Sequence, residues 1–336
     1  MSDEDTGLDP ARLFDGFAPF SGLLLAVSGG PDSMALLRLA AAWRDAGATQ
    51  FLTAATVDHG LRPDSAAEAG QVGRWAEALG ISHQILRWSG AKPTAGIQER
   101  ARHARYQLLF DHLRDIGSAA LVTAHHADDQ WETIMIRLAR GSGISGLAGM
   151  SREQDLYGAR LLRPLLDTSK SQLIAYCRRC GQPFFNDPSN ADPRFARTQW
   201  RELAPSLHHL GLTPARAFKL AERADKADQA LYWAADRFFS CVKISPEENV
   251  YNLDGAGEAP LAIIEHFLQS AVVKTSGVRP PRLDRLENLA VQLSAAVRAG
   301  EDLRATLGGC MLALDRGQRL RIRVENERRR GVQRKT

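Results

Sequence analysis

Short apolar runs alternate with amphipathic stretches through the first half of the chain, a pattern typical of a parallel α/β sheet. The apolar runs predict buried strands at 22–27, 51–57, 82–88 and 119–124. The amphipathic stretches predict helices at 33–46, 65–79, 97–116 and 128–139. With 183–185 as a fifth strand, the pattern predicts a doubly wound, parallel, five-stranded sheet with helices on both faces.

The rest of the chain is mainly helical by pattern. The run LLRPLL at 161–166 contains a proline and is predicted as an edge strand or a loop. Helices are expected at 168–179, 197–209, 214–242, 260–273 and 281–298, followed by short strands within 303–324. A boundary near 211–214 then predicts three domains: the sheet domain at 15–211, a mainly helical domain at 212–300 and a small mixed C-terminal module at 301–336.

Composition is that of an ordinary globular protein, with 44% hydrophobic and 24% charged residues among 336. No run reaches the roughly 18 apolar residues that a membrane helix needs. The first ten residues, MSDEDTGLDP, lack the basic and apolar regions of a signal peptide. We therefore expect a cytoplasmic protein with no membrane partner.

The net charge of +4 mildly favours binding to polyanions. Basic residues gather at 160–201 and again at 315–335, where the chain ends in ERRRGVQRKT. This basic tail is either an RNA contact or a solvated, frayed end, and the sequence leaves both open.

The strongest chemical signal is the segment Ser28-Gly29-Gly30-Pro31-Asp32-Ser33, between the first predicted strand and helix. Backbone N–H groups and the positive end of a helix hold phosphate at such a place. The two glycines allow close approach, the two serines offer hydroxyl donors, and proline is tolerated in a first turn. Asp32 beside phosphates requires a bridging cation, so Mg²⁺ is implied, with Asp32 as its ligand.

This loop is neither a Walker A sequence nor G-x-G-x-x-G, although a strand-to-helix turn with chance glycines is an alternative. The pattern S-G-G-x-D-S resembles the pyrophosphate loop of the N-type ATP pyrophosphatases. That resemblance implies an adenine nucleotide alpha hydrolase-like fold. It also implies that the loop grips the β and γ phosphates of ATP while a nucleophile attacks the α-phosphate, releasing pyrophosphate.

Four further segments resemble one family of that superfamily, the tRNA(Ile)-lysidine synthetases. They are D-H-G-L-R at 58–62, A-R-x-x-R-Y at 101–106, T-A-H-H-x-D-D-Q-x-E-T at 123–133, and D-x-S-N at 187–190 with Arg197 and Arg201. Thr198 departs from the pattern, since the family usually has Asn there. The resemblance covers residues 22–205, and the C-terminal region matches only loosely.

The resemblance implies a two-step reaction on tRNA(Ile) with a CAU anticodon. The C2 carbonyl oxygen of the first anticodon cytidine attacks Mg·ATP and becomes adenylated, and free L-lysine then attacks C2 and displaces AMP. The base must leave its stack to reach the site. ATP and Mg²⁺ are the implied cofactors, tRNA(Ile) and L-lysine are the implied partners, and a homodimer is left open.

The same resemblance implies the site residues. His125 ends a predicted strand, and Asp129 and Glu132 lie three apart on the next helix, so that two carboxylates beside a histidine could seat an ammonium group and remove its proton. Arg105 could neutralise phosphate charge in the transition state. Contacts to the tRNA backbone are expected from Arg194, Arg197 and Arg201 and from the C-terminal part of the chain, with 212–300 as a helical tRNA-binding domain.

Structural roles for these residues remain open alternatives. Asp129 and Glu132 could complement a helix dipole, and Arg105 could lie on a solvated helix face. His125 and His126 could ligate zinc, but no cysteine lies nearby in the sequence.

Two other functions compete with this interpretation. A tRNA thiolase of the same superfamily would need Cys177 and Cys180 for sulfur transfer, whereas chance spacing is favoured for this C-x-x-C pair because no third cysteine is close. A non-catalytic, nucleotide-responsive RNA-binding protein would release no AMP from ATP in the presence of tRNA and lysine.

Overall fold

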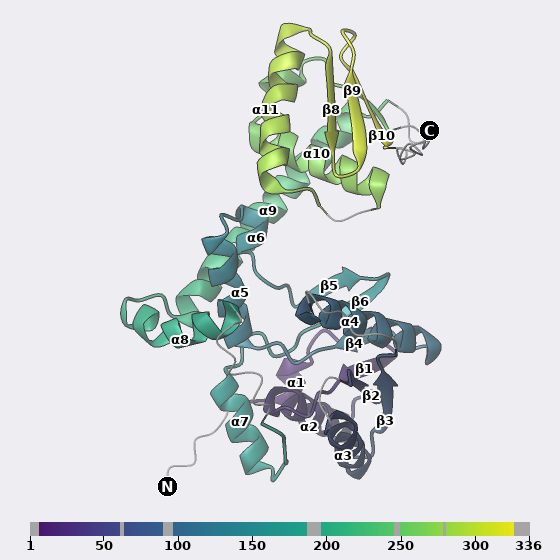
Figure 1. The fold of residues 1–336 in the computed structure, drawn as a ribbon, viewed down its shortest axis with the longest axis vertical. Coiled ribbons are helices and arrows are strands. Elements are labelled where there is room, and N and C mark those ends of the chain that lie inside the picture. The colour runs from purple at the N-terminus through teal and green to yellow at the C-terminus, as the bar shows by residue number, and fades with distance from the viewer. Residues whose placement is uncertain are drawn as a thin grey trace, which may run out of the picture. The chain divides into compact units, whose positions relative to one another are not determined.

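The chain forms two compact units in a computed structural model that describes residues 7–60, 64–89, 97–186, 196–244, 249–277 and 280–325 (Figure 1). Unit 1 comprises Met1–Arg140 and Gly149–Ala221, and unit 2 comprises Gly141–Ala148 and Glu222–Thr336. The long helix α9 (Pro214–Val242) begins in unit 1 and ends in unit 2.

Unit 1 contains a six-stranded sheet in the order β3-β2-β1-β4-β6-β5. Its strands are β1 (Gly22–Ala26), β2 (Phe51–Asp58), β3 (Ser82–Arg87), β4 (Ala120–Val122), β5 (Glu153–Leu156) and β6 (Ala159–Leu162). All neighbours are parallel except β5, which pairs antiparallel with β6. The predicted α/β sheet, dominated by parallel strands, is therefore confirmed.

The sheet has the predicted five parallel strands and, in addition, an antiparallel edge strand that was not predicted, while the predicted position of the fifth strand was wrong. The fifth parallel strand is β6, which ends before Pro164, so the proline interrupts no ladder. Strand β5 has a polar, mostly exposed sequence, EQDL, without an apolar pattern to reveal it. Residues 183–185 form no strand; instead the backbone N–H of Phe185 donates to the carbonyl of Gly29 at 2.8 Å.

Helices cover both faces of the sheet because β1 is apolar on both sides. The helices of unit 1 are α1 (Pro10–Leu13), α2 (Pro31–Asp45), α3 (Ser65–Ala78), α4 (Ile97–Asp115), α5 (Ala127–Ala139), α7 (Lys170–Arg179) and α8 (Ala196–His209). Leu23 and Leu25 pack in a core with side chains of α2, α3 and α7. Leu24 points the other way and packs with Phe110 and its neighbours on α4.

Unit 2 pairs helices with a four-stranded antiparallel sheet in the order β7-β10-β9-β8. Its remaining elements are α6 (Ile144–Leu147), β7 (Val250–Asn252), η2 (Ala256–Glu258), α10 (Leu261–Ser276), α11 (Leu283–Ala299), β8 (Leu303–Leu307), β9 (Cys310–Leu314) and β10 (Arg319–Val324). Fully buried Tyr251, Phe267 and Leu268 lie in its separate core. Among the residues described, no helix has the length and apolar character needed to span a bilayer.

Candidate functional site

The loop between β1 and α2 is closed by its own hydroxyl groups. Ser33 Oγ accepts a hydrogen bond from the backbone N–H of Ser28 at 3.1 Å and lies 3.0 Å from the carbonyl oxygen of Gly30, to which it donates. Helix α2 begins at Pro31, and its N-cap residue, Gly30, has no side chain that could accept a hydrogen bond from the first turn. The first-turn N–H groups are therefore available to an anion.

The two glycines of this loop are required for different reasons. Gly29 has a φ of +86°, and a Cβ there would lie 2.9 Å from both Phe185 Cδ2 and Val72 Cγ2. A Cβ on Gly30 would meet only Ser28 Oγ, at 3.9 Å. The fold itself thus requires glycine at 29, whereas the open space at 30 is what close approach of a ligand to the backbone would need.

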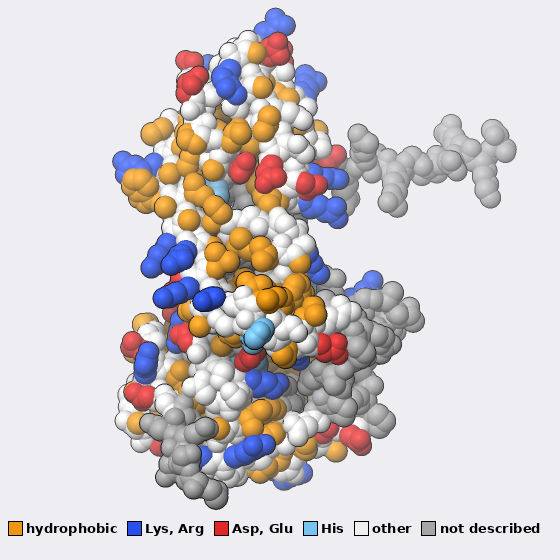
Figure 2. Space-filling view, turned by 90° about the vertical axis from the view of Figure 1, so that its left-hand side faces the viewer, with side chains coloured by type: hydrophobic (Ala, Val, Ile, Leu, Met, Phe, Trp, Pro, Cys, Tyr) orange, Lys and Arg blue, Asp and Glu red, His pale blue; other side chains and the backbone are white. Residues whose placement is uncertain are grey.

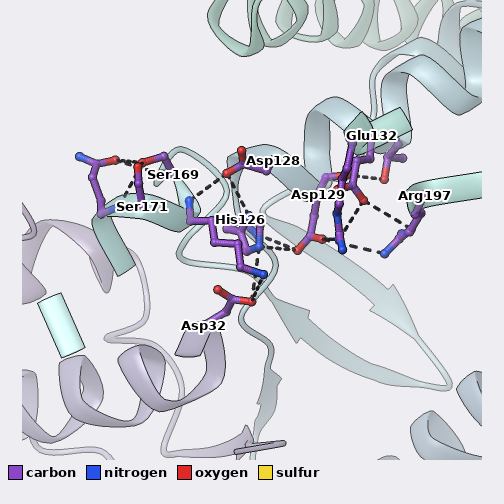
Figure 3. Close-up of polar contacts among 12 residues, drawn as sticks. Asp32, His126, Asp128, Asp129, Glu132, Ser169, Ser171 and Arg197 are labelled. Carbon is purple, nitrogen blue, oxygen red and sulfur yellow. Dashed lines mark hydrogen bonds and ion pairs between the residues drawn. The ribbon is translucent and has the colours of Figure 1, made fainter. Parts of the chain in front are cut away.

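His126 lies at the centre of the polar cluster drawn in Figure 3. Its Nε2 lies 3.5 Å from Asp32 Oδ2 and 3.4 Å from Asp129 Oδ2, and its Nδ1 lies 3.4 Å from Asp128 Oδ2. The side chain is 2% exposed and stands at the N-cap of α5. This histidine therefore joins the phosphate loop after β1 to the loop after β4, at the carboxyl edge of the sheet where α/β folds bind ligands.

The carboxylates keep the His126 imidazole protonated. Burial opposes the charge, but the close contacts with the Asp128 and Asp32 carboxylates and the charge of Asp129 raise the pKa of His126 to about 10. In return, the contact with His126 lowers the pKa of Asp128 to about 2, against the opposing effect of burial. At neutral pH this cluster holds an imidazolium ion, which cannot act as a general base.

Helix α7 closes the cluster through Lys170, its first residue. The Lys170 backbone N–H donates to Asp128 Oδ2 at 2.8 Å, and its Nζ lies 3.8 Å from Asp32 Oδ2. Asp32 Oδ2 thus lies between two cationic groups.

The other oxygen of Asp32 has the properties of a metal ligand. Asp32 Oδ1 is buried and has no hydrogen-bond partner among the described residues. Mg²⁺ typically takes one or two carboxylates together with substrate phosphates, so this oxygen beside the phosphate loop fits that ion. Within the same described residues, no three His, Cys, Asp or Glu side chains are placed to hold a metal by themselves.

The predicted lysine-binding carboxylates and two of the predicted tRNA-binding arginines contact one another. Glu132 is 1% exposed; Arg201 Nε donates to its Oε1, and Arg201 Nη2 donates to its Oε2 at 3.2 Å. Arg201 Nη2 also lies 3.9 Å from Asp129 Oδ1, and Arg197 lies 4.0 Å from each carboxylate. These contacts join α8 to α5.

Charge in the cluster is balanced. Burial raises the pKa of Glu132, although the hydrogen bond and charge of Arg201 act in the opposite direction. Four carboxylates face four cationic groups: Asp32, Asp128, Asp129 and Glu132 against His126, Lys170, Arg197 and Arg201. A charged ligand entering the site must therefore exchange with partners that are already present.

His125 lies in a different environment from its neighbour. Its Nδ1 is 2.9 Å from Thr123 Oγ1. Burial, together with the charges of Arg163 and other nearby arginines, keeps the pKa of His125 well below its ordinary value, although Asp129 acts in the opposite direction. The histidine named from the sequence is thus neutral, whereas His126, considered there only as a zinc ligand, is the one that contacts the carboxylates.

Sequence reasoning missed His126, Asp128 and Lys170 as members of the site. The signal for His126 was its position directly before the acidic first turn of α5, where an N-cap side chain meets those carboxylates. Lys170 is distant in sequence and gave no such signal.

Of the remaining predicted site residues, the structure describes Arg105 but not Arg194. Arg105 is exposed on α4, with its guanidinium 5.9 Å from the centre of the Tyr106 ring. Arg194 lies outside the described residues, as do 187–190 and Arg62.

Cys177 of the C-x-x-C pair has the environment of a structural cysteine. Cys177 is fully buried in the unit 1 core, and its Sγ lies 3.5 Å from the carbonyl oxygen of Pro31. Burial raises the pKa of Cys177 to about 12, so its thiol is not a reactive nucleophile at neutral pH.

Comparison with known proteins identifies close relatives. Residues 10–207 match the PP-loop domain family. The chain is 45% identical to the tRNA(Ile)-lysidine synthase of Methylobacterium nodulans, over 92% of each protein. It is 44% identical to the tRNA(Ile)-lysidine synthase of Rhodopseudomonas palustris, over 93% of this chain and 92% of that protein.

A solved structure with a similar fold is the U34-tRNA thiolase NcsA from Methanococcus maripaludis, determined with its [4Fe-4S] cluster. The TM-score is 0.52 over 60% of this chain and 71% of that chain, and the sequences are 16% identical. This likeness concerns the fold alone.

Proposed function

This chain belongs to the tRNA(Ile)-lysidine synthase family, ATP-dependent ligases that form a carbon–nitrogen bond, and from that premise we propose how its residues perform the reaction. The substrates are ATP, free L-lysine and tRNA(Ile) with a CAU anticodon, and the modified atom is C2 of the first anticodon cytidine. The products are lysidine in the tRNA, AMP and pyrophosphate.

One observation supports this proposal most directly. The phosphate loop and the carboxylates expected to receive lysine are separated by about a hundred residues of sequence, yet His126 links Asp32 to Asp129 with contacts of 3.5 and 3.4 Å. A triphosphate on the loop and an amine at Asp129 would therefore lie in one site, as a two-step adenylation and amination requires.

In the first step, Ser28–Ser33 and the N-terminus of α2 hold the β and γ phosphates. The C2 carbonyl oxygen of the cytidine bonds to the α-phosphorus, and pyrophosphate leaves. Asp32 Oδ1 is the oxygen that would bind Mg²⁺, which neutralises phosphate charge when bound. Arg105 is proposed to stabilise the same charge from α4.

In the second step, the lysine nitrogen bonds to C2, and the C2–oxygen bond breaks to release AMP. The ammonium group must first lose a proton. Asp129 and Glu132 are proposed to bind this group in exchange for contacts with Arg197 and Arg201. Glu132 is the better proton acceptor of the site because burial raises its pKa, whereas the low pKa of His125 makes that imidazole a weak base.

The proposal is tested by AMP release from ATP with purified tRNA(Ile), while the amino acid is varied. We expect AMP and pyrophosphate in equal amounts and a requirement for L-lysine. AMP release that does not depend on lysine would contradict the assignment of lysine as substrate but would leave the adenylation step supported. Formation of ADP would contradict the assignment of the phosphate loop.

The metal assignment is tested separately with Asp32→Asn. Loss of this carboxylate should lower AMP release by roughly 100-fold or more, because charge stabilisation at the phosphates is lost. The matched control is Asp45→Asn, which changes an exposed carboxylate at the other end of α2. Near-normal rates for Asp32→Asn across a Mg²⁺ titration would refute the metal role.

A further inference from the structure

The phosphate loop has no basic side chain of its own. Ser28–Ser33 contains two serines, two glycines, a proline and an aspartate. A Walker A loop, by contrast, carries a lysine that reaches the β and γ phosphates. The first turn of α2 contributes roughly half an elementary charge, which is small beside the charge of a triphosphate. A cationic side chain from another segment of the chain is therefore needed at this loop.

Helix α7 brings a lysine to the first turn of α2. Lys170 is the first residue of α7, and its Nζ lies 3.8 Å from Asp32 Oδ2. Packing fixes this approach, since Leu173 and Cys177 of α7 lie in the unit 1 core. The Cys177 thiol also donates to the carbonyl oxygen of Pro31 at 3.5 Å. The lysine therefore reaches the loop because two helices pack together, although the two segments are distant in sequence.

The backbone of Lys170 is fixed in place by a capping box. Ser169 is the N-cap of α7, and its Oγ accepts a hydrogen bond from the backbone N–H of Gln172 at 3.3 Å (Figure 3). In return, Gln172 Oε1 accepts from the backbone N–H of Ser169 at 2.9 Å. The backbone N–H of Lys170 donates to Asp128 Oδ2 at 2.8 Å. These bonds set the point from which the lysine side chain extends.

The ammonium group of Lys170, by contrast, is loosely held. Its distance of 3.8 Å from Asp32 Oδ2 is longer than a hydrogen bond, and the side chain is 38% exposed. Exposed ion pairs of this kind contribute little free energy. The four-carbon stem of lysine is flexible, and its ammonium donors rotate. Turning this group toward a phosphate therefore costs little.

The other cationic groups of the cluster are engaged elsewhere. His126 also lies beside Asp32, but it is 2% exposed and contacts three carboxylates. The two arginines of α8 contact Asp129 and Glu132 instead. Lys170 is therefore the cationic group of this cluster that both adjoins Asp32 and is accessible to a ligand.

We propose that Lys170 binds the β and γ phosphates of ATP by moving its ammonium group from Asp32 to the phosphate oxygens. This inference rests on the proposed function, which places a triphosphate on the loop. When the bond between the α-phosphorus and the bridging oxygen breaks, its electron pair stays on that oxygen, and the leaving pyrophosphate gains negative charge. The ammonium group keeps its protons and stabilises this charge by direct contact. Lys170 thus supplies from α7 the cation that a Walker A loop contains within itself.

The test is the affinity of the full chain for inorganic pyrophosphate, measured by calorimetry. K170M removes the charge and keeps an unbranched side chain. We expect the Kd for pyrophosphate to rise about tenfold or more, because a charge-assisted contact is lost, and the Kd for AMP to stay as in the wild type. K170R retains the charge and should keep most of the pyrophosphate affinity.

A second background separates direct contact from an effect through Asp32. D32N removes the carboxylate that the ammonium group now faces. If Lys170 contacts the phosphates, K170M should weaken pyrophosphate binding in the D32N chain as well. If Lys170 only neutralises Asp32, K170M should change nothing in that background, and the proposal is refuted.

Two controls make the result specific. Basic side chains are scattered over the surface, as Figure 2 shows for one face, so the loss of a charge elsewhere must be compared. K219M removes an exposed lysine of α9 within unit 1 and should bind pyrophosphate like the wild type. K170M should also melt at the wild-type temperature, because the exposed ion pair contributes little free energy. Equal losses for pyrophosphate and AMP in K170M, or an equal loss in K219M, would overturn the inference.

AMP release distinguishes this role from the proposed function. K170M should release AMP about 100-fold more slowly or worse, since one donor to a developing charge is lost, whereas K170R should retain most of the rate. A wild-type rate in K170M would refute the role of Lys170. If the wild type releases no AMP with any tRNA, the proposed function fails, and the pyrophosphate affinities alone decide the role of Lys170.

Discussion

At the scale of single residues, two adjacent histidines are held in opposite charge states. His126 is surrounded by three carboxylates, whereas His125 is buried beside a hydroxyl group and arginines. Environments that separate the pKa values of neighbouring groups divide electrostatic from proton-transfer roles. Here the division gives His126 a fixed positive charge that positions Asp32 and Asp129.

The charge of His126 predicts a pH dependence of stability. Its pKa rises from 6.5 in the unfolded chain to about 10 in the folded protein, so its contribution is complete below pH 6.5 and lost as the pH rises through 10. The free energy of unfolding should therefore fall by at most roughly 5 kcal/mol between pH 6.5 and 10, at about 1.4 kcal/mol per unit.

Urea unfolding at pH 7, 8.5 and 10 measures this fall. His126→Gln should remove it, whereas His209→Gln, which changes an exposed histidine, should retain it. A wild-type slope equal to that of His126→Gln would contradict the ion-pair assignment.

The two loop glycines give a second prediction at this scale. Gly29→Ala must place a Cβ against Phe185 and Val72 at positive φ, so it should lower the melting temperature and prevent ATP binding. Gly30→Ala meets no protein atom closer than 3.9 Å and should keep the wild-type melting temperature while weakening ATP binding at least tenfold. Thermal melts and nucleotide titrations distinguish the two; tight ATP binding by Gly30→Ala would show that phosphate does not approach this backbone.

At the scale of elements, α5 and α8 are joined by an ion pair between buried Glu132 and half-buried Arg201. Glu132 on α5 is inaccessible to water, and Arg201 on α8 donates two hydrogen bonds to it. Such a pair is costly to break from one side because the remaining charge stays buried.

This pair predicts strong coupling in a double-mutant cycle. Arg201→Gln alone should destabilise unit 1 by about 2–4 kcal/mol, whereas adding Glu132→Gln should restore part of the loss, giving a coupling of about 1–3 kcal/mol. Urea unfolding of the four proteins measures it. Arg197→Gln, whose contacts are longer at 4.0 Å, should cost less; additive losses would show that the pair contributes no interaction energy.

The helix boundaries show where sequence periodicity predicts an element well and where it does not. Helices α2, α4, α5 and α9 begin and end within a few residues of their predicted ranges, because long amphipathic stretches carry a repeated signal. Ser65 precedes Glu68 by three residues, the spacing of a capping box, yet it is the first residue of α3 and donates its hydroxyl to Asp58 at 2.7 Å. The role of Ser65 depends on its contact with Asp58 of β2, and the sequence pattern of the helix alone does not reveal that contact.

At the scale of the whole molecule, the two units have separate hydrophobic cores. Ligands of the phosphate loop bind unit 1, so ATP should stabilise that unit selectively. We expect two calorimetric transitions. ATP at a hundred times its Kd should raise the free energy of unfolding of unit 1 by about 2.7 kcal/mol and therefore shift only the transition of that unit to higher temperature.

The assignment of the transitions is tested with Leu268→Ala, which truncates a fully buried side chain of the unit 2 core. It should lower the free energy of unfolding of unit 2 by about 2–5 kcal/mol, and so shift only the transition that does not respond to ATP. A single transition that moves with both ATP and Leu268→Ala would show that the units unfold together.

The sequence by itself determined what depends on neighbours along the chain. Strand and helix periods predicted a parallel α/β sheet, and the order of serine, glycine and aspartate after β1 predicted the phosphate loop, because both signals lie within a few consecutive residues. The tertiary structure decided which groups meet: Lys170 with Asp32, Arg201 with Glu132, and His126 instead of His125 with the carboxylates. Contacts between distant segments follow from packing, and packing also sets burial. Burial and the charged partners of each group together set the charge states on which the chemistry depends.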